Sequence, residues 1–119
     1  MRFNLLIIGG YCLSTLAIKG AVTPQGGEFP LVGDIAGHQQ HPSLALYREG
    51  GLVAWQNATV DSGGERVVVQ ALGADYRGLG APQVVSQNIT GQNDLNPAVA
   101  ALPEGRSVVV WESGPRSSQ

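Results

Sequence analysis

The residues best suited to chemistry lie near the middle of the chain, in the tetrapeptide DSGG at positions 61–64. In one class of serine protease, the nucleophilic serine stands between an aspartate and two glycines in this way. Such a serine needs a histidine base and an aspartate that orients the base. The only histidines, His38 and His41, lie well upstream and beside each other in a loop-like stretch. We therefore interpret Ser62 as a turn residue and predict that the chain carries no catalytic residue.

The other polar side chains point weakly to a metal. His38 and His41 have no third nitrogen or sulfur ligand that would complete a transition-metal site, so we interpret them as part of a solvated loop. Calcium remains the alternative, because carboxylate and carbonyl oxygens of loops are the ligands it prefers. The aspartates that could supply them are Asp34, Asp61, Asp75 and Asp94, and none belongs to a spaced Asp-x-Asp motif. We expect no cofactor.

Two tryptophans, Trp55 and Trp111, close similar apolar runs. A large indole ring is most often buried between packed sheets, and we expect this for both residues. The alternative is an exposed ring on which a carbohydrate ligand could stack.

The first part of the chain has the pattern of an export signal. Arg2 is followed by an apolar stretch over residues 3–18, which Lys19 ends. That stretch is shorter than the roughly 20 residues that a membrane-spanning helix needs. We predict a secretory signal peptide at residues 1–21 and a secreted or cell-surface protein. A buried N-terminal helix or an uncleaved anchor is the alternative.

Composition narrows the class of protein. The only cysteine, Cys12, lies inside the predicted signal, so no disulfide is expected in the mature part. Without residues 1–21 the chain has five basic and nine acidic residues, a net charge of −4, and no lysine. That charge argues against nucleic acid and anionic membranes as partners.

After residue 30 the apolar residues do not recur at helical spacing. They form short runs that are separated by glycine-containing turns, the pattern of an antiparallel β-meander. We predict strands in the runs 43–47, 52–56, 66–72, 82–86, 97–102 and 107–113, with turns at 48–51, 61–64, 77–80 and 103–106. A further strand is expected at 29–32.

The chain also repeats itself. Residues 33–56 match residues 87–112 at eight positions, in order, with a spacing of 54 to 56 residues. The matching pairs include Pro42 with Pro97, Glu49-Gly50 with Glu104-Gly105, and Trp55 with Trp111. About four strands in each period are typical of a β-propeller blade.

The pattern P-x-x-A-x-L-x-(D/E)-G-x-x-V-V-x-W, carried here by residues 97–111, resembles a repeat of large bacterial secreted and surface proteins. Those proteins often also carry hemolysin-type calcium-binding modules. The resemblance covers residues 28–113 and implies an all-β, propeller-like fold without a common catalytic residue.

These observations predict one and a half four-stranded blades. We expect the end of one blade and a first full repeat at 28–86, half of a second repeat at 87–113, and a truncated tail at 114–119. The expected function is a non-enzymatic extracellular module for structure, adhesion or ligand binding. The alternative is the N-terminal part of a secreted propeller hydrolase, such as a glycosidase, with its catalytic residues elsewhere. The expected partners are further blades of a longer chain or, by self-association, other copies.

Overall fold

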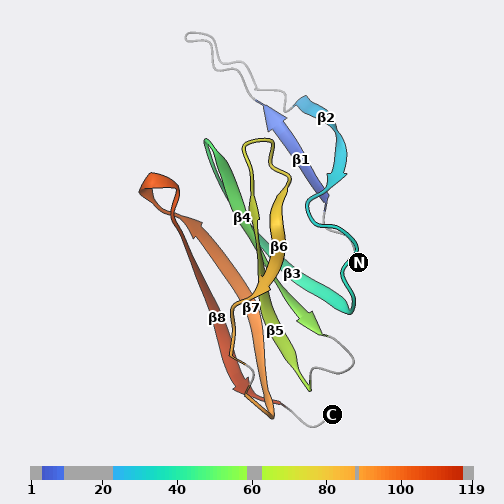
Figure 1. Cartoon of the computed structure of the whole chain (residues 1–119), viewed down its shortest axis with the longest axis vertical. Coiled ribbons are helices and arrows are strands. Elements are labelled where there is room, and N and C mark those ends of the chain that lie inside the picture. Colours follow the sequence, from blue (N-terminus) through green and yellow to red (C-terminus); the bar gives the residue numbers. More distant parts are fainter. Residues whose placement is uncertain (1–3, 10–22, 59–62, 88, 117–119) are drawn as a thin grey trace.

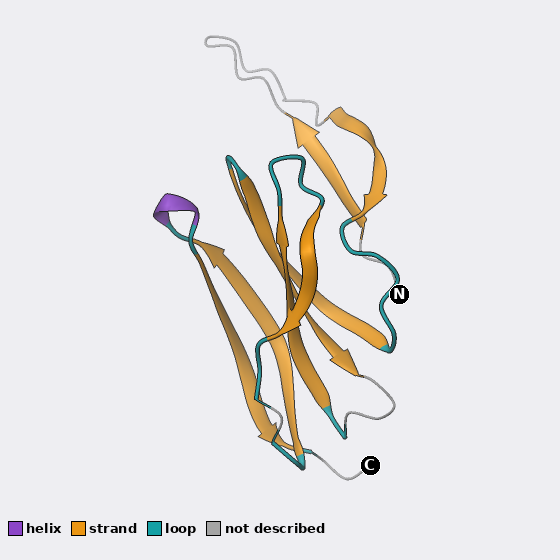
Figure 2. Ribbon diagram, in the orientation of Figure 1, coloured by secondary structure: helices purple, strands orange, loops and turns teal. Residues whose placement is uncertain are grey.

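The structure, a computed structural model, describes residues 4–9, 23–58, 63–87 and 89–116. These residues form eight strands and one 3-10 turn, η1, at Pro103–Gly105. The strands are β1 (Asn4–Gly9), β2 (Thr23–Pro30), β3 (His38–Tyr47), β4 (Gly50–Ala58), β5 (Glu65–Leu72), β6 (Gly78–Val84), β7 (Gln92–Ala101) and β8 (Ser107–Pro115). The predicted all-β, antiparallel architecture is confirmed (Figure 2).

The strands pair in chain order into three antiparallel sheets. β3, β4, β5 and β6 make a four-stranded sheet, whereas β1–β2 and β7–β8 are two-stranded. Figure 1 shows the β7–β8 hairpin beside the four-stranded sheet and the β1–β2 hairpin beyond one end of it. β7 packs across β3, β4 and β5, so the second hairpin covers one face of the sheet.

The core lies on the opposite face of the four-stranded sheet. Successive side chains of a strand point to opposite faces, so Val53 and Trp55 of β4 share this face, and Trp55 pairs with Val68 of β5. These residues form one buried cluster with Leu31 and Val32 of the segment after β2. β4 is therefore covered on both faces, which explains why nearly every residue along it is buried.

The hairpins β3–β4 and β7–β8 share a backbone feature. The register of β3 against β4 shifts between Gln40 and Ser43, and that of β7 against β8 shifts between Leu95 and Ala98. The residue before the proline has a positive φ in each bulge, 49° at His41 and 51° at Asn96. The matching sequence motif therefore produces matching local geometry.

Several predicted boundaries are wrong: β6 begins before the run 82–86 and β7 begins before the run 97–102. The turn expected at 77–80 lies earlier, at 73–77, where the Gly73 N–H donates to the Arg77 carbonyl at 2.9 Å. Gly78 already begins β6, and Gly80 has a φ of 74° within the strand because the pairing with β5 is irregular there. The strand expected at 29–32 ends at Pro30, after which the chain bends.

The N-terminal strand β1 pairs with β2. Most of the predicted signal peptide, residues 10–21 among them, lies outside the described residues. No helix in the part of the chain that the structure describes has the length and apolar character needed to cross a bilayer.

Candidate functional site

Three of the seven buried polar residues in the described part of the chain, Gln56, Arg66 and Asp94, lie where the four-stranded sheet meets the β7–β8 hairpin. We call this contact the seam. Its hydrogen-bonding residues are Ser43, Gln56, Glu65 and Arg66 on the sheet, and Gln92, Asn93, Asp94, Asn96 and Val99 on the hairpin.

Gln56 lies at the centre of the seam with only 3% of its surface exposed. Its Oε1 accepts a hydrogen bond from the Asn96 backbone N–H at 3.2 Å and lies 3.0 Å from Nδ1 of His41. Its Nε2 donates to the Glu65 carboxylate at 2.7 Å and to Oε1 of Gln40 at 3.4 Å. One amide thus satisfies polar groups from β3, β5 and β7, which a buried junction requires.

Arg66 is a second buried link. Its Nη1 donates to the Gln92 carbonyl at 3.0 Å and to the Glu65 carbonyl at 2.9 Å. The same atom lies 3.9 Å from Oδ2 of Asp94, which is also buried. A buried guanidinium requires an opposite charge nearby. Asp94 of β7 supplies that charge for Arg66 of β5.

Backbone groups extend the seam at both ends. The Glu65 N–H donates to Oδ1 of Asn93 at 3.1 Å, and the Val99 N–H donates to Oγ of Ser43 at 3.0 Å. Side chains of the sheet and of the β7–β8 hairpin therefore satisfy each other's backbone groups, which aligns β7 on the sheet.

The residues that the sequence singled out for chemistry do not converge. Ser62 and Asp61 lie outside the described residues. His38 is exposed, and His41 reaches Gln56 of the seam. Within the described ranges, no three His, Cys, Asp or Glu side chains come together in a way that could hold a metal ion.

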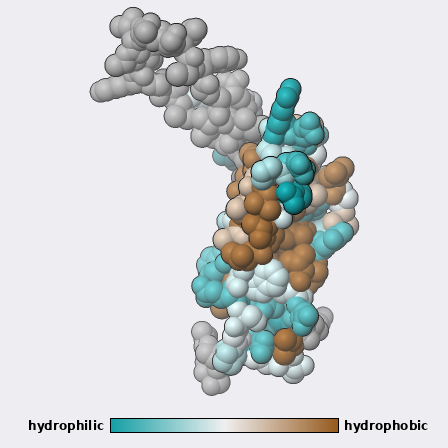
Figure 3. Space-filling model, turned by 90° about the vertical axis from the view of Figure 1, so that its left-hand side faces the viewer, coloured by the Kyte–Doolittle hydropathy of each residue, from teal (hydrophilic) through white to brown (hydrophobic). Residues whose placement is uncertain are grey.

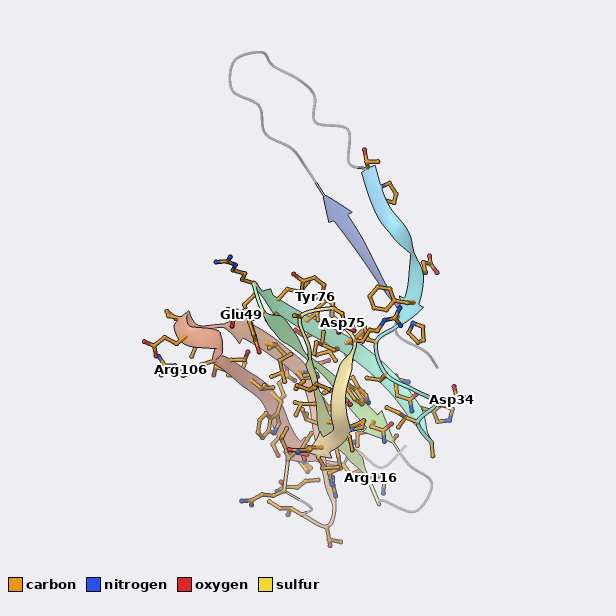
Figure 4. The ribbon with its side chains drawn as sticks, turned by 45° about the horizontal axis from the view of Figure 1, so that its top comes forward. Asp34, Glu49, Asp75, Tyr76, Arg106 and Arg116 are labelled. Carbon is orange, nitrogen blue, oxygen red and sulfur yellow. The ribbon has the colours of Figure 1, made fainter. Side chains whose placement is uncertain are left out.

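The three other candidate calcium ligands have separate surroundings. Asp34 and Asp75 lie in different loops (Figure 4), and the Asp75 carboxylate accepts a hydrogen bond from the Arg77 N–H at 3.1 Å. Asp94 was expected in a loop, but it lies in β7 and faces Arg66. The loop expectation for Asp94 is wrong because β7 begins two residues earlier, at Gln92.

The residues that match between the segments 33–56 and 87–112 occupy corresponding positions in β3–β4 and β7–β8. Trp55 and Trp111 lie on the second strands of their hairpins, β4 and β8. Trp55 is fully buried, whereas 37% of Trp111 is exposed, so only the first indole is a core residue.

The remaining shared residues lie at the bulges and at the hairpin turns. Pro42 and Pro97 each follow the positive-φ residue of a bulge. Glu49-Gly50 and Glu104-Gly105 lie where each hairpin turns, as expected.

A cleft lies between those two turns. It has a volume of about 460 Å³ and combines an aromatic ring with charged and apolar groups: Tyr47, Arg48, Glu49, Leu102, Pro103, Glu104 and Gly105 line it. Figure 4 shows Glu49 and Arg106 at the same end of the molecule. Repetition of the turn therefore creates a polar-rimmed depression between neighbouring hairpins.

Sequence reasoning missed the roles of Gln56 and Arg66. The repeat offered a signal for the first, because Gln56 and Glu112 both follow the shared tryptophan. Arg66 had no counterpart to compare, since the second repeat has no described strand that corresponds to β5.

Comparison with protein-family models, with curated proteins and with solved structures finds no match to this chain.

Proposed function

We propose that the chain is a non-enzymatic extracellular repeat module made of propeller-type blades. In this proposal β3–β6 form one blade and β7–β8 form the first half of the next. The order β3-β4-β5-β6, in which each strand pairs with the one that follows it, is the connection expected within a blade. The β7–β8 hairpin packs on the face of that sheet, as a following blade would.

The seam is the observation that carries this proposal. Gln56, Arg66 and Asp94 are buried polar residues. Their hydrogen bonds and their ion pair join the four-stranded sheet to the β7–β8 hairpin. A side chain that acts on a substrate must instead present a group to an open site. The polar residues of the seam are therefore best explained as structural.

A ligand-binding role would use the cleft between the two turns. Tyr47 can stack on an apolar ring face, while Glu49 and Glu104 can accept hydrogen bonds from hydroxyl groups. These properties favour a carbohydrate over an acidic ligand.

Replacement of Gln56 tests the structural role. Gln56→Leu keeps the size of the side chain but leaves the Asn96 N–H and the Glu65 carboxylate without this partner. We expect a loss of about 1–3 kcal/mol in the free energy of unfolding, the cost of leaving buried polar groups unsatisfied. Urea denaturation measures this loss, with Gln83→Leu on the exposed strand β6 as the matched control. A Gln56→Leu variant as stable as the control would contradict the proposal.

Export and the absence of serine chemistry need a separate experiment. Mass spectrometry of protein secreted by an expression host should find an N-terminus between Ile18 and Thr23. A serine-directed phosphonate should not label the secreted protein. Labelling that disappears in Ser62→Ala would support the hydrolase alternative, and an intact Met1 in secreted protein would contradict the predicted signal.

A further inference from the structure

β8 has an edge that no described strand occupies. It pairs with β7 on one side only, in a sheet of two strands. The Leu102 N–H donates to the Arg106 carbonyl at 2.8 Å, so Arg106 directs its polar groups toward the β7 side. Because these directions alternate along an antiparallel strand, Val108 and Val110 also face β7, while Ser107, Val109 and Trp111 present their N–H and C=O groups to the open edge.

This edge lacks the features that protect other strand edges of the molecule. Prolines and positive-φ residues interrupt a strand and prevent another strand from pairing with it. Each of the other edge strands of the two C-terminal sheets contains both: His41 and Pro42 in β3, Gly80 and Pro82 in β6, and Asn96 and Pro97 in β7. In β8 the only proline is the terminal Pro115, and none of its non-glycine residues has a positive φ.

The outer face of β8 is apolar as well as uncovered. Val108 and Val110 are 42% and 58% exposed, and Figure 3 shows an apolar patch on this side of the molecule. The corresponding positions of β4 are Leu52 and Ala54, on the face over which β7 packs. At these positions of β4, the face is covered by the β7–β8 hairpin.

We propose that β8 of a second copy of the chain pairs with this edge, antiparallel and about a two-fold axis at Val109. In that register Val108 lies opposite the second copy's Val110, and Arg106 lies opposite the second copy's Glu112. The axis repeats both contacts, so one continuous sheet of four strands carries a stripe of four valines with an ion pair at each end. This pairing rests on the function proposed above, because a second copy would complete the β7–β8 half-blade by self-association.

The charges along β8 favour a second copy of the chain as the partner, and they favour this register. Arg106 and Glu112 are the only charged residues at positions 106–114, and the symmetric register brings opposite charges together at both ends. Their present neighbours are weak. Arg106 lies 4.0 Å from Glu104, and its Nε donates an exposed hydrogen bond of 3.3 Å to the Pro103 carbonyl. Glu112 accepts one exposed hydrogen bond of 3.4 Å from Asn96. Both charges can therefore turn to a second copy at little cost.

Cysteine cross-linking of the full chain tests the register. In a background of Cys12→Ser, Val109→Cys places two sulfhydryl groups at facing positions, where Cα atoms are about 5.5 Å apart and a disulfide can form. The matched control is Val84→Cys on β6, whose exposure of 63% exceeds that of the β8 valines. We expect mild oxidation to convert most of the Val109→Cys chain to a covalent dimer and the control only slightly. Equal cross-linking of both variants would overturn the register.

Sedimentation tests the association without any change in the fold. The full chain should form dimers at concentrations below about 1 mM, the limit for weak specific complexes. Arg106→Glu or Glu112→Arg alone should weaken the dimer roughly five- to tenfold, because the symmetry duplicates each exposed ion pair. The double variant should restore most of the affinity. A monomer throughout this range, or a double variant no tighter than the singles, would overturn the proposal.

Discussion

Trp55 and Trp111 show that residues at equivalent positions can contribute differently to the stability of the fold. Both occupy the same position on the second strand of a hairpin, but Trp55 belongs to the buried cluster that includes Leu31, Val32 and Val68, while 37% of Trp111 is exposed. The hydrophobic contribution of a side chain scales with the apolar area removed from water, so identity of residue type does not ensure identity of role.

Alanine substitutions should separate the two tryptophans. Trp55→Ala should lower the free energy of unfolding by about 3–5 kcal/mol, the range for a large buried aromatic residue. Trp111→Ala should cost less than Trp55→Ala, because 37% of Trp111 is already exposed to water. Urea titrations followed by far-ultraviolet circular dichroism would measure both. Equal losses would mean that Trp111 is covered in solution, as it would be if a partner packs on β8.

The hairpin turns extend this contrast to whole elements. Both turns contain a Glu-Gly pair, but the glycine of the first turn is packed much more closely than that of the second. Gly50 has a φ of 146°, and a Cβ atom there would collide with the Leu72 carbonyl oxygen of β5. Gly105 has a φ of 70°, and its nearest neighbour would be Cε2 of Tyr47 at 3.7 Å, an ordinary contact. The first turn is therefore constrained by sheet pairing as well as by its own backbone.

Glycine replacement should reveal that constraint. Gly50→Ala should destabilise the chain by about 2–4 kcal/mol, from backbone strain together with the steric conflict. Gly105→Ala should cost only about 1–2 kcal/mol, the penalty for a left-handed conformation in a residue with a side chain. Thermal unfolding of both variants is a sufficient measurement. If Gly105→Ala were the more damaging change, the turn of β7–β8 would be packed more tightly than described.

In the molecule as a whole, the three sheets depend on each other unequally. The four-stranded sheet is joined to β7–β8 by the seam and to the segment after β2 by Leu31 and Val32. β2 is also tied to the sheet where the Arg77 guanidinium lies 4.8 Å from the centroid of the Phe29 ring. β1, in contrast, packs mainly against β2. We therefore expect the cluster around Trp55 to persist without β1.

Removal of residues 1–21, the predicted signal, should change the free energy of unfolding by less than about 1 kcal/mol, as for other weakly attached termini. Leu31→Ala in the shortened chain should cost about 2–5 kcal/mol, because that side chain belongs to the buried cluster. Tryptophan fluorescence during denaturation follows both, since Trp55 lies in the same cluster. Loss of a cooperative transition in the shortened chain would show that β1 is part of the folding unit.

Sequence reasoning alone established the strand-by-strand layout of residues 43–113. Short apolar runs and glycine-containing turns are local signals, and all six runs predicted in this part of the chain lie in strands or include strand residues. The repeat also predicted which hairpins correspond, because its prolines and glycines specify bulges and turns through backbone sterics. The turn at 77–80 failed for a related reason: a glycine can mark an irregular strand as readily as a turn.

The contacts of the seam and the open edge of β8 could be identified only from the three-dimensional structure. Which of two equivalent tryptophans is buried, and which amide joins three strands, depends on contacts between segments that are distant in sequence. Gln56 and Asn96 are forty residues apart, and no local pattern links them. Burial is a property of the assembled layers: a strand pattern states which side chains share a face, but only packing determines whether another layer covers that face.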